Sequence, residues 1–191
     1  MVFNNTFSPA AVRLQPVEPR HAPLLCFGLL VTSCALASFA LACATPFAAF
    51  AVIAAATLPW RPACLVVVGA WLINQAIGFG VHHYPVDAST IAWGFVIGAA
   101  ALAATAVSIV ILRALLPDRL LPALALALIC AYAAYELVVL AATPVLGGKG
   151  AFTTAIVTRI GSLNVAWLIG LVAACEIVRL VNPYRRGQTV S

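Results

Sequence analysis

The sequence is poor in charged residues. Of its 191 residues, 8% are Asp, Glu, Lys or Arg, whereas 64% are hydrophobic and the mean hydropathy is +1.11. A soluble domain has about 25% charged residues, and this chain could not cover a water-facing surface with so few. Lipid is therefore predicted to be its main solvent. The alternation of apolar and polar residues that marks membrane β-strands is missing too, so we expect a bundle of transmembrane helices.

The sequence also lacks the short motifs of common enzymes and metal sites. Its six cysteines are scattered without a Cys-x-x-Cys pair, so we interpret them as small packing residues. No Walker motif, His-Glu-x-x-His or Gly-x-Ser-x-Gly occurs. We therefore expect no enzymatic activity and no cofactor of the protein's own. A membrane-embedded enzyme that uses the histidines and Glu136 is kept as an alternative.

Breaks between the apolar runs predict six membrane spans. Residues 22–60 carry no formal charge and are nearly twice as long as one crossing, so the chain must turn back, and Pro46 is the natural break. Trp60-Arg61-Pro62 is interpreted as an interfacial turn, and Ser89 or Thr90 as the cap of span four. We expect spans at about residues 23–44, 47–59, 63–81, 89–112, 121–146 and 151–181, with an N-terminal segment at 1–22 and a tail at 182–191.

The distribution of basic residues tests this count. With a cytoplasmic N-terminus, eight basic residues lie on the inner side and two, Lys149 and Arg159, on the outer side. The inner eight are Arg13, Arg20, Arg61, Arg113, Arg119, Arg179, Arg185 and Arg186. The fold class predicted is thus a six-helix bundle of a bacterial inner membrane, with both termini cytoplasmic. The net charge of +5 then reflects topology and lipid head groups, and we expect no nucleic-acid partner.

The outer end of span three gathers polar and aromatic residues. Asn74 and Gln75 lie within about two helical turns of the membrane surface, and Gly78 and Gly80 permit a close approach. A compact outer loop and the start of span four follow, with His82, His83, Tyr84, Pro85, Asp87 and Trp93. One hypothesis is a ligand site at an outer mouth. The alternative is that the amides only brace helix contacts while the other residues line the interface.

Two charges fall inside predicted spans. Glu136 in span five and Arg159 in span six are expected at similar depth, about 12–14 Å below the outer surface. A lone charge there costs at least a few kcal/mol, so we expect the two to pair. With Tyr135 they would either line a polar cavity or form a structural brace. Glu176 and Arg179 are interpreted as an ion pair at the inner helix end.

Size, span number and the polar outer mouth resemble the substrate-binding S components of energy-coupling-factor transporters. Within residues 71–94, Asn74-Gln75, Gly78-Phe79, Tyr84-Pro85 and Trp93-Gly94 are similar to the BtuM group, whose members are linked to cobalamin uptake. The resemblance implies a corrinoid or similar small molecule bound at the outer face and an energising module as partner. BtuM-like proteins can offer a cysteine to the corrinoid cobalt, but no cysteine lies between Cys64 and Cys130.

The predicted function is therefore uptake of a vitamin-type ligand, with cobalamin as the transported molecule rather than a cofactor. If it is the ligand, His82 or His83 would supply the axial cobalt ligand, since imidazole binds cobalt. The predicted binding residues are Asn74, Gln75, His82, His83, Tyr84, Trp93, Tyr135, Glu136 and Arg159. The alternative from another class is an accessory or assembly subunit that moves nothing across the bilayer.

Overall fold

The computed structural model describes residues 14, 21–41, 44–115, 120–148 and 152–181, and these ranges contain helices and no strands. The predicted N-terminal segment, apart from residues 14, 21 and 22, and the predicted tail lie outside the described residues. The helices are α2 (Ala22–Leu41), α3 (Phe47–Thr57), α4 (Trp60–Gly80), α5 (Ala88–Ala114), α6 (Leu120–Leu146) and α7 (Thr154–Val181).

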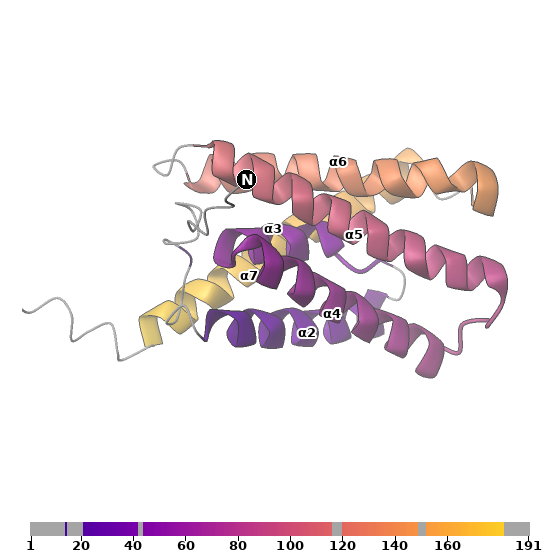
Figure 1. Cartoon of the computed structure of the whole chain (residues 1–191), viewed down its shortest axis with the longest axis horizontal. Coiled ribbons are helices and arrows are strands. Elements are labelled where there is room, and N and C mark those ends of the chain that lie inside the picture. Colours follow the sequence, from indigo (N-terminus) through magenta and orange to yellow (C-terminus); the bar gives the residue numbers. More distant parts are fainter. Residues whose placement is uncertain (1–13, 15–20, 42–43, 116–119, 149–151, 182–191) are drawn as a thin grey trace, which may run out of the picture.

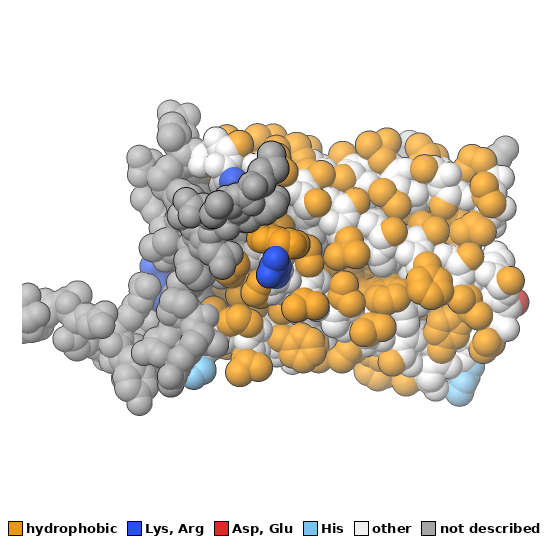
Figure 2. Space-filling view, in the orientation of Figure 1, with side chains coloured by type: hydrophobic (Ala, Val, Ile, Leu, Met, Phe, Trp, Pro, Cys, Tyr) orange, Lys and Arg blue, Asp and Glu red, His pale blue; other side chains and the backbone are white. Residues whose placement is uncertain are grey.

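Five of these helices are long and apolar enough to cross a membrane, and α3 is the short exception. On the face seen in Figure 2, apolar side chains cover the bundle between its two ends. Large side chains such as Leu65, Val110 and Leu121 are more than 60% exposed, which suits contact with lipid rather than water. The chain therefore has the character of a multi-pass membrane protein.

Successive helices run in opposite directions along the bundle (Figure 1). We call the end where α2 begins and α7 ends the terminal end, and the opposite end the loop end. The loop end carries residues 81–87, between α4 and α5, and residues 147–148, after α6. Gly147 and Gly148 have φ angles of +82° and +93°, which glycine adopts freely, so they stop α6 and turn the chain.

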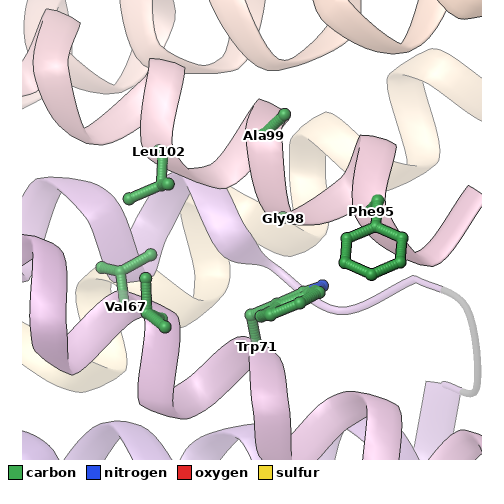
Figure 3. Close-up of a pocket in the computed structure, with 7 residues that line it drawn as sticks. Val67, Trp71, Phe95, Gly98, Ala99 and Leu102 are labelled. Atoms are coloured by element: carbon green, nitrogen blue, oxygen red, sulfur yellow. The ribbon is translucent and has the colours of Figure 1, made fainter.

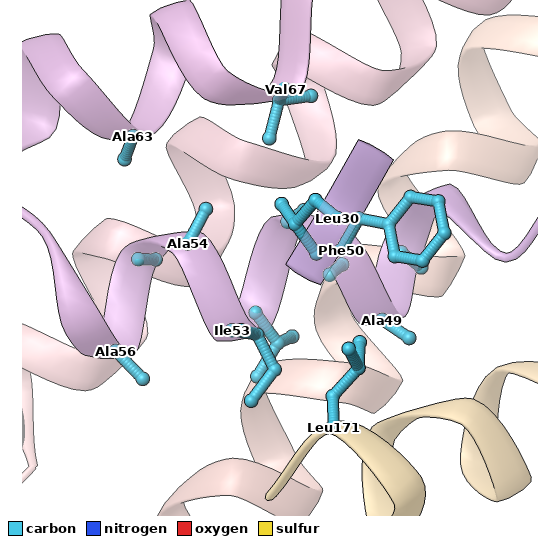
Figure 4. Close-up of a cluster of buried hydrophobic side chains, with 14 of the residues drawn as sticks. Leu30, Ala49, Phe50, Ile53, Ala54, Ala56, Ala63, Val67 and Leu171 are labelled. Atoms are coloured by element: carbon cyan, nitrogen blue, oxygen red, sulfur yellow. The ribbon is translucent and has the colours of Figure 1, made fainter. Parts of the chain in front are cut away.

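Helix α3 forms the centre of the bundle, and all eleven of its residues are buried. Its sequence, FAAFAVIAAAT, has no polar face, as expected of a helix surrounded by others. The alanines allow close approach, and side chains from the surrounding helices, including Leu30, Val67 and Leu171, pack around it (Figure 4). The predicted second span is therefore a buried helix about 16 Å long, too short to cross the membrane core by itself.

Helices α2 and α4 pack closely through small residues. The Cys34 thiol donates a hydrogen bond to the carbonyl oxygen of Ala70 at 3.2 Å, and Ala37 is fully buried. A Cβ atom added to Gly69 would lie 2.6 Å from the Phe27 ring, so only glycine fits there without displacement of that ring. The described cysteines are free, in agreement with a packing role.

Two local predictions at helix starts were wrong. Trp60-Arg61-Pro62 is the first turn of α4 rather than a turn before it. Proline is tolerated there because the first N–H groups of a helix have no partner in the helix. Helix α5 is capped by Asp87, whose carboxylate accepts hydrogen bonds from the Thr90 backbone N–H at 2.9 Å and hydroxyl at 3.0 Å.

Helix α7 is the least embedded of the long helices. Its buried residues are Asn164, Leu168, Leu171 and Cys175, a single narrow stripe that lies mainly against α3. It touches α6 only slightly and runs obliquely behind the other helices (Figure 1). At its terminal end, the Arg179 guanidinium lies 2.6 Å from the Glu176 carboxylate, which confirms the predicted helix-end ion pair.

Candidate functional site

The shortness of α3 leaves the two halves of the bundle unequal. Helix α3 begins at Phe47, and the chain that reaches it from the loop end, Ala44 to Pro46, is not helical. The loop-end half therefore has only a non-helical segment where the other half has a helix. Two adjacent cavities lie in this half, and both are lined by residues near the loop ends of the long helices.

We call the larger hollow, of about 460 Å³, the charged cavity. It lies between α6 and α7, with Trp93 and Ile97 of α5 on a third side. Most of its wall is apolar, and the exceptions include Glu136 and Arg159. Its lining residues are Ala44, Trp93, Ile97, Tyr135, Glu136, Val139, Gly148, Phe152, Ile156, Arg159 and Ile160.

We call the smaller hollow, of about 270 Å³, the amide cavity. It lies between the loop-end halves of α4 and α5. Uncharged hydrogen-bonding groups and aromatic rings dominate its wall, and none of the described residues that line it is charged. Its lining residues are Phe47, Asn74, Gln75, Phe79, Tyr84, Pro85, Thr90, Trp93, Gly94 and Ile97.

Trp93 and Ile97 line both cavities, so the two hollows are separated by little more than these side chains. The residues are four apart on α5 and share one face of the helix. The Trp93 ring also lies against Gly148, where an added Cβ atom would be 3.5 Å from it. Seven of the nine predicted binding residues line one cavity or the other: Asn74, Gln75, Tyr84, Trp93, Tyr135, Glu136 and Arg159.

Asn74 is held firmly in the wall of the amide cavity. Its side-chain nitrogen donates hydrogen bonds of 2.9 Å to the hydroxyl oxygens of Ser38 and Thr45. Its amide oxygen accepts a longer bond, of 3.3 Å, from the Gln75 amide. Asn74 thus braces α4 against α2 and against the segment before α3. The Gln75 oxygen lies against Gly94, whose missing Cβ leaves room for it.

Neither predicted histidine lines the charged cavity or the amide cavity. Nε2 of His82 lies 3.0 Å from the carbonyl oxygen of Ser38 near the end of α2, so this nitrogen must carry the hydrogen and donate it. The His82 ring also stacks on Tyr84, with 5.8 Å between ring centroids. His83 is exposed and has a φ of +53°. Among the described residues, no three His, Cys, Asp or Glu side chains are close enough to hold a metal ion.

Gly78 makes room for the protein's own chain. A Cβ atom there would lie 2.7 Å from the Tyr84 ring, and the Tyr84 backbone N–H donates to the Gly78 carbonyl at 3.1 Å. The glycine therefore lets the loop after α4 fold back against that helix. This contact positions Tyr84 in the wall of the amide cavity.

Glu136 and Arg159 line the same cavity but do not pair as predicted. Among the described residues no ion pair joins them, and the Glu176–Arg179 contact is the one that forms. Counted along the helices, Arg159 lies five residues after the start of α7, and Glu136 ten residues before the end of α6. These counts do not give relative depth, because α7 does not start level with the end of α6. The hydrogen bond between Tyr132 and Val157 places Arg159 near the level of Tyr132, no nearer the loop end than Glu136.

Helices α6 and α7 meet just beside the charged cavity. The Tyr132 hydroxyl donates a hydrogen bond of 2.8 Å to the carbonyl oxygen of Val157, and the Tyr132 ring lies close to Gly161. This contact holds the helices together while the space next to it stays open. Asn164 lies deeper on α7, where its side-chain oxygen accepts a bond of 3.0 Å from the Ala49 backbone N–H.

Several lining residues were not predicted from the sequence, among them Ile97, Phe152 and Phe79. Ile97 could have been found, because it lies one helical turn after Trp93 on the same face. Phe79 and Phe152 resemble the many other apolar residues of the chain. Nothing in their sequence pattern distinguishes a cavity wall from a surface in contact with lipid.

A third hollow, of about 220 Å³, lies between α4 and α5 beside Trp71 and Phe95 (Figure 3). Its wall is apolar except for the Trp71 indole N–H, which already donates to the Gly94 carbonyl at 2.8 Å. It therefore offers no free polar group to orient a ligand. The charged and amide cavities are the better candidate site.

Comparison with known proteins identifies no relative: no family model, no curated protein and no solved structure matches the chain.

Proposed function

We propose that this protein binds a vitamin-type small molecule at the loop end of the bundle and mediates its uptake across the bacterial inner membrane. The observation that carries the proposal is the pair of adjoining cavities, of about 460 and 270 Å³, divided by Trp93 and Ile97. Small-molecule sites are typically hollows of about 300–1,000 Å³ with mostly apolar walls and a few placed polar groups. The charged cavity has this character by itself, and the amide cavity extends it across Trp93 and Ile97.

The second span, in which a non-helical segment precedes the short helix α3, supports a transport role. Non-helical backbone at membrane depth is tolerated where it is buried or lines a cavity, and transporters use such broken elements at their binding sites. Ala44, in the non-helical segment, and Phe47, directly after it, each line one of the cavities. We propose that the passage from α2 to α4 counts as one crossing and that the chain crosses the membrane six times.

Basic residues support an orientation with the loop end outside. Arg61, Arg113 and Arg179 lie at helix ends of the terminal end, whereas Arg159 belongs to the loop-end half. Cytoplasmic ends of membrane proteins are enriched in Lys and Arg. The other residues counted for this rule, including Lys149, lie outside the described part of the chain.

A corrinoid is the first ligand to test, because residues 71–94 resemble the BtuM group. We expect cobalamin to bind the purified protein in detergent, detected by its visible absorption after gel filtration. Ile97→Trp fills the wall between the cavities and should abolish binding. Val110→Trp, on the exposed side of the same helix, is the matched control and should bind normally. Absence of bound cobalamin in the wild-type protein would contradict the corrinoid assignment.

The axial-ligand role of His82 or His83 stays a prediction that the same assay tests. If either imidazole binds cobalt, its replacement by alanine shifts the absorption of the bound corrinoid. An unchanged spectrum in both variants would keep binding and remove the axial ligand. Energy for uptake would come from an energy-coupling-factor module or an ion gradient, because the sequence has no Walker motif.

The second candidate is an accessory or assembly subunit, and the bonding of Asn74 favours it. A side chain whose hydrogen bonds join α4 to Ser38 and Thr45 serves as a brace whether or not a ligand binds. Uptake assays in a strain that depends on this gene separate the two functions. A blocked cavity in the Ile97→Trp variant should stop uptake by a transporter but leave assembly of a partner complex intact.

A further inference from the structure

The charged cavity holds two opposite charges that do not neutralise each other. Glu136 and Arg159 face a hollow whose other walls are mainly Trp93, Ile97, Phe152 and further apolar side chains. No ion pair joins them within the described part of the chain, and they reach the cavity from different helices, α6 and α7. The cavity wall therefore presents a cationic group from α7 and an anionic group from α6.

Glu136 is half-buried within hydrogen-bonding reach of the Tyr132 hydroxyl, whereas Arg159 is exposed, so each has room for a further partner. A charged group inside a membrane protein costs several kcal/mol unless water, another charge or a ligand satisfies it. A guanidinium group donates hydrogen bonds and binds anions. A carboxylate accepts hydrogen bonds from N–H groups. Aromatic walls such as Trp93 and Phe152 suit a flat or ring-shaped body. Together these groups describe the ligand that would fit.

We infer that the charged cavity selects an organic molecule that carries an anionic group at one end and an N–H donor, either ammonium or amide, at the other. Arg159 binds the anion, Glu136 accepts from the donor, and the ring body lies against Trp93. This inference rests on the proposed function, since it takes the cavity to hold the transported molecule. It adds the chemical class of the molecule that the cavity would select.

Two kinds of molecule carry these groups, although cobalamin is larger than the cavity and would enter it with only part of its structure. Cobalamin carries a phosphate diester and several amide groups, and cobinamide keeps amides but lacks that phosphate. Tryptophan is a small aromatic zwitterion, for which indole-3-propionate lacks the ammonium group and tryptamine lacks the carboxylate. These five compounds form two matched sets of probes. Binding of each to the purified full-length protein is measured by equilibrium dialysis.

The variants are Arg159→Gln and Glu136→Gln, with the double variant Glu176→Gln/Arg179→Gln as control for a charge pair on α7 outside the cavity. In at least one set, we expect the compound with both groups to bind the wild type at least about tenfold tighter than its matched compound. Arg159→Gln should remove the advantage given by the anion, and Glu136→Gln that given by the ammonium. The control should keep both.

Each alternative result has a distinct meaning. Equal affinity for matched compounds, or unchanged selectivity in both variants, would overturn the inference while binding itself upholds the proposed function. Failure of all five compounds to bind a correctly folded wild type would overturn both. Gel filtration and thermal melting of each variant show whether a loss of binding reflects unfolding.

Discussion

Asn74 has a structural role that can be measured apart from any ligand. Its amide hydrogens serve the hydroxyls of Ser38 and Thr45, both at 2.9 Å. Replacing Asn74 by leucine leaves these hydroxyls without a donor, and loss of such bonds costs about 1–3 kcal/mol. We therefore expect a lower melting temperature for Asn74→Leu in detergent. Gln75→Leu loses a single longer bond and should destabilise less; equal effects would contradict the brace.

Asp87 predicts a dependence of stability on acid pH. Hydrogen bonds from the Thr90 backbone and hydroxyl lower the pKa of the Asp87 carboxyl from its ordinary value of 3.8. Because the folded-state pKa is the lower one, this contribution to stability is complete above pH 3.8 and is lost as pH falls through the lowered value. The melting temperature of the wild type should therefore fall toward that of Asp87→Asn as the pH is lowered from 6 to 3.

The exposed neighbour Val86 provides the control for this effect. Val86→Ala should melt in parallel with the wild type over the same pH range, because no titrating group changes. A constant difference between wild type and Asp87→Asn down to pH 3 would show that the carboxylate does not stabilise the start of α5. Since Thr90 lines the amide cavity, the same cap also positions a wall of the candidate site.

At the scale of elements, the start of α3 depends on a side chain from another helix. Pro46 precedes α3 and provides no side-chain cap, and the Ala49 N–H donates instead to Asn164 of α7. Asn164→Leu would leave that buried N–H without a partner, at a cost of about 1–3 kcal/mol. We expect a clear fall in melting temperature, because α3 forms the core of the bundle.

Ser162 is the matched control on α7. It is exposed, and its hydroxyl donates within its own helix to the Arg159 carbonyl at 2.8 Å. Ser162→Ala should therefore change the melting temperature little. If Asn164→Leu were equally mild, the cap on α3 would not contribute to stability, and the loop-end half of the bundle would be held open by packing alone.

The helices could be predicted from the sequence, whereas the relations between them could not. Pro46 interrupts a run of uncharged residues too long for one crossing, and the Gly147-Gly148 pair marks the end of α6. Both helix boundaries could therefore be predicted from the sequence. That α3 is wholly buried was not predicted, because an all-apolar run of eleven residues suits lipid as well as a core. The surrounding helices decide between these environments, and they come from distant parts of the chain.

For the candidate site too, individual residues could be predicted from the sequence, whereas the contacts between them could not. Trp93, Gln75 and Tyr84 were predicted as binding residues and do line a cavity, because polar and aromatic groups are conspicuous in an apolar chain. The pairing of Glu136 with Arg159 was wrong, since the sequence gives positions along each helix but not where α7 begins. His82 was predicted as a ligand, yet its hydrogen bond to Ser38 depends on how the loop folds back.

At the scale of the whole molecule, the orientation in the membrane decides whether the cavities meet the outside. The arginines at the terminal end predict that the loop end faces away from the cytoplasm. Val86, at the loop end, is 80% exposed, and Ala114, at the last residue of α5 on the terminal end, is also exposed. Single cysteines at these two positions, in a chain whose native cysteines are replaced by alanine, report which end is outside.

A membrane-impermeant maleimide should label Val86→Cys in intact spheroplasts and Ala114→Cys only after the membrane is broken. The reason is electrostatic: the arginines of the terminal end are retained on the cytoplasmic side during insertion. The reverse pattern would place both cavities toward the cytoplasm and turn uptake into export. Labelling of both cysteines from outside would mean that α5 does not cross the membrane, and the proposed six crossings would be wrong.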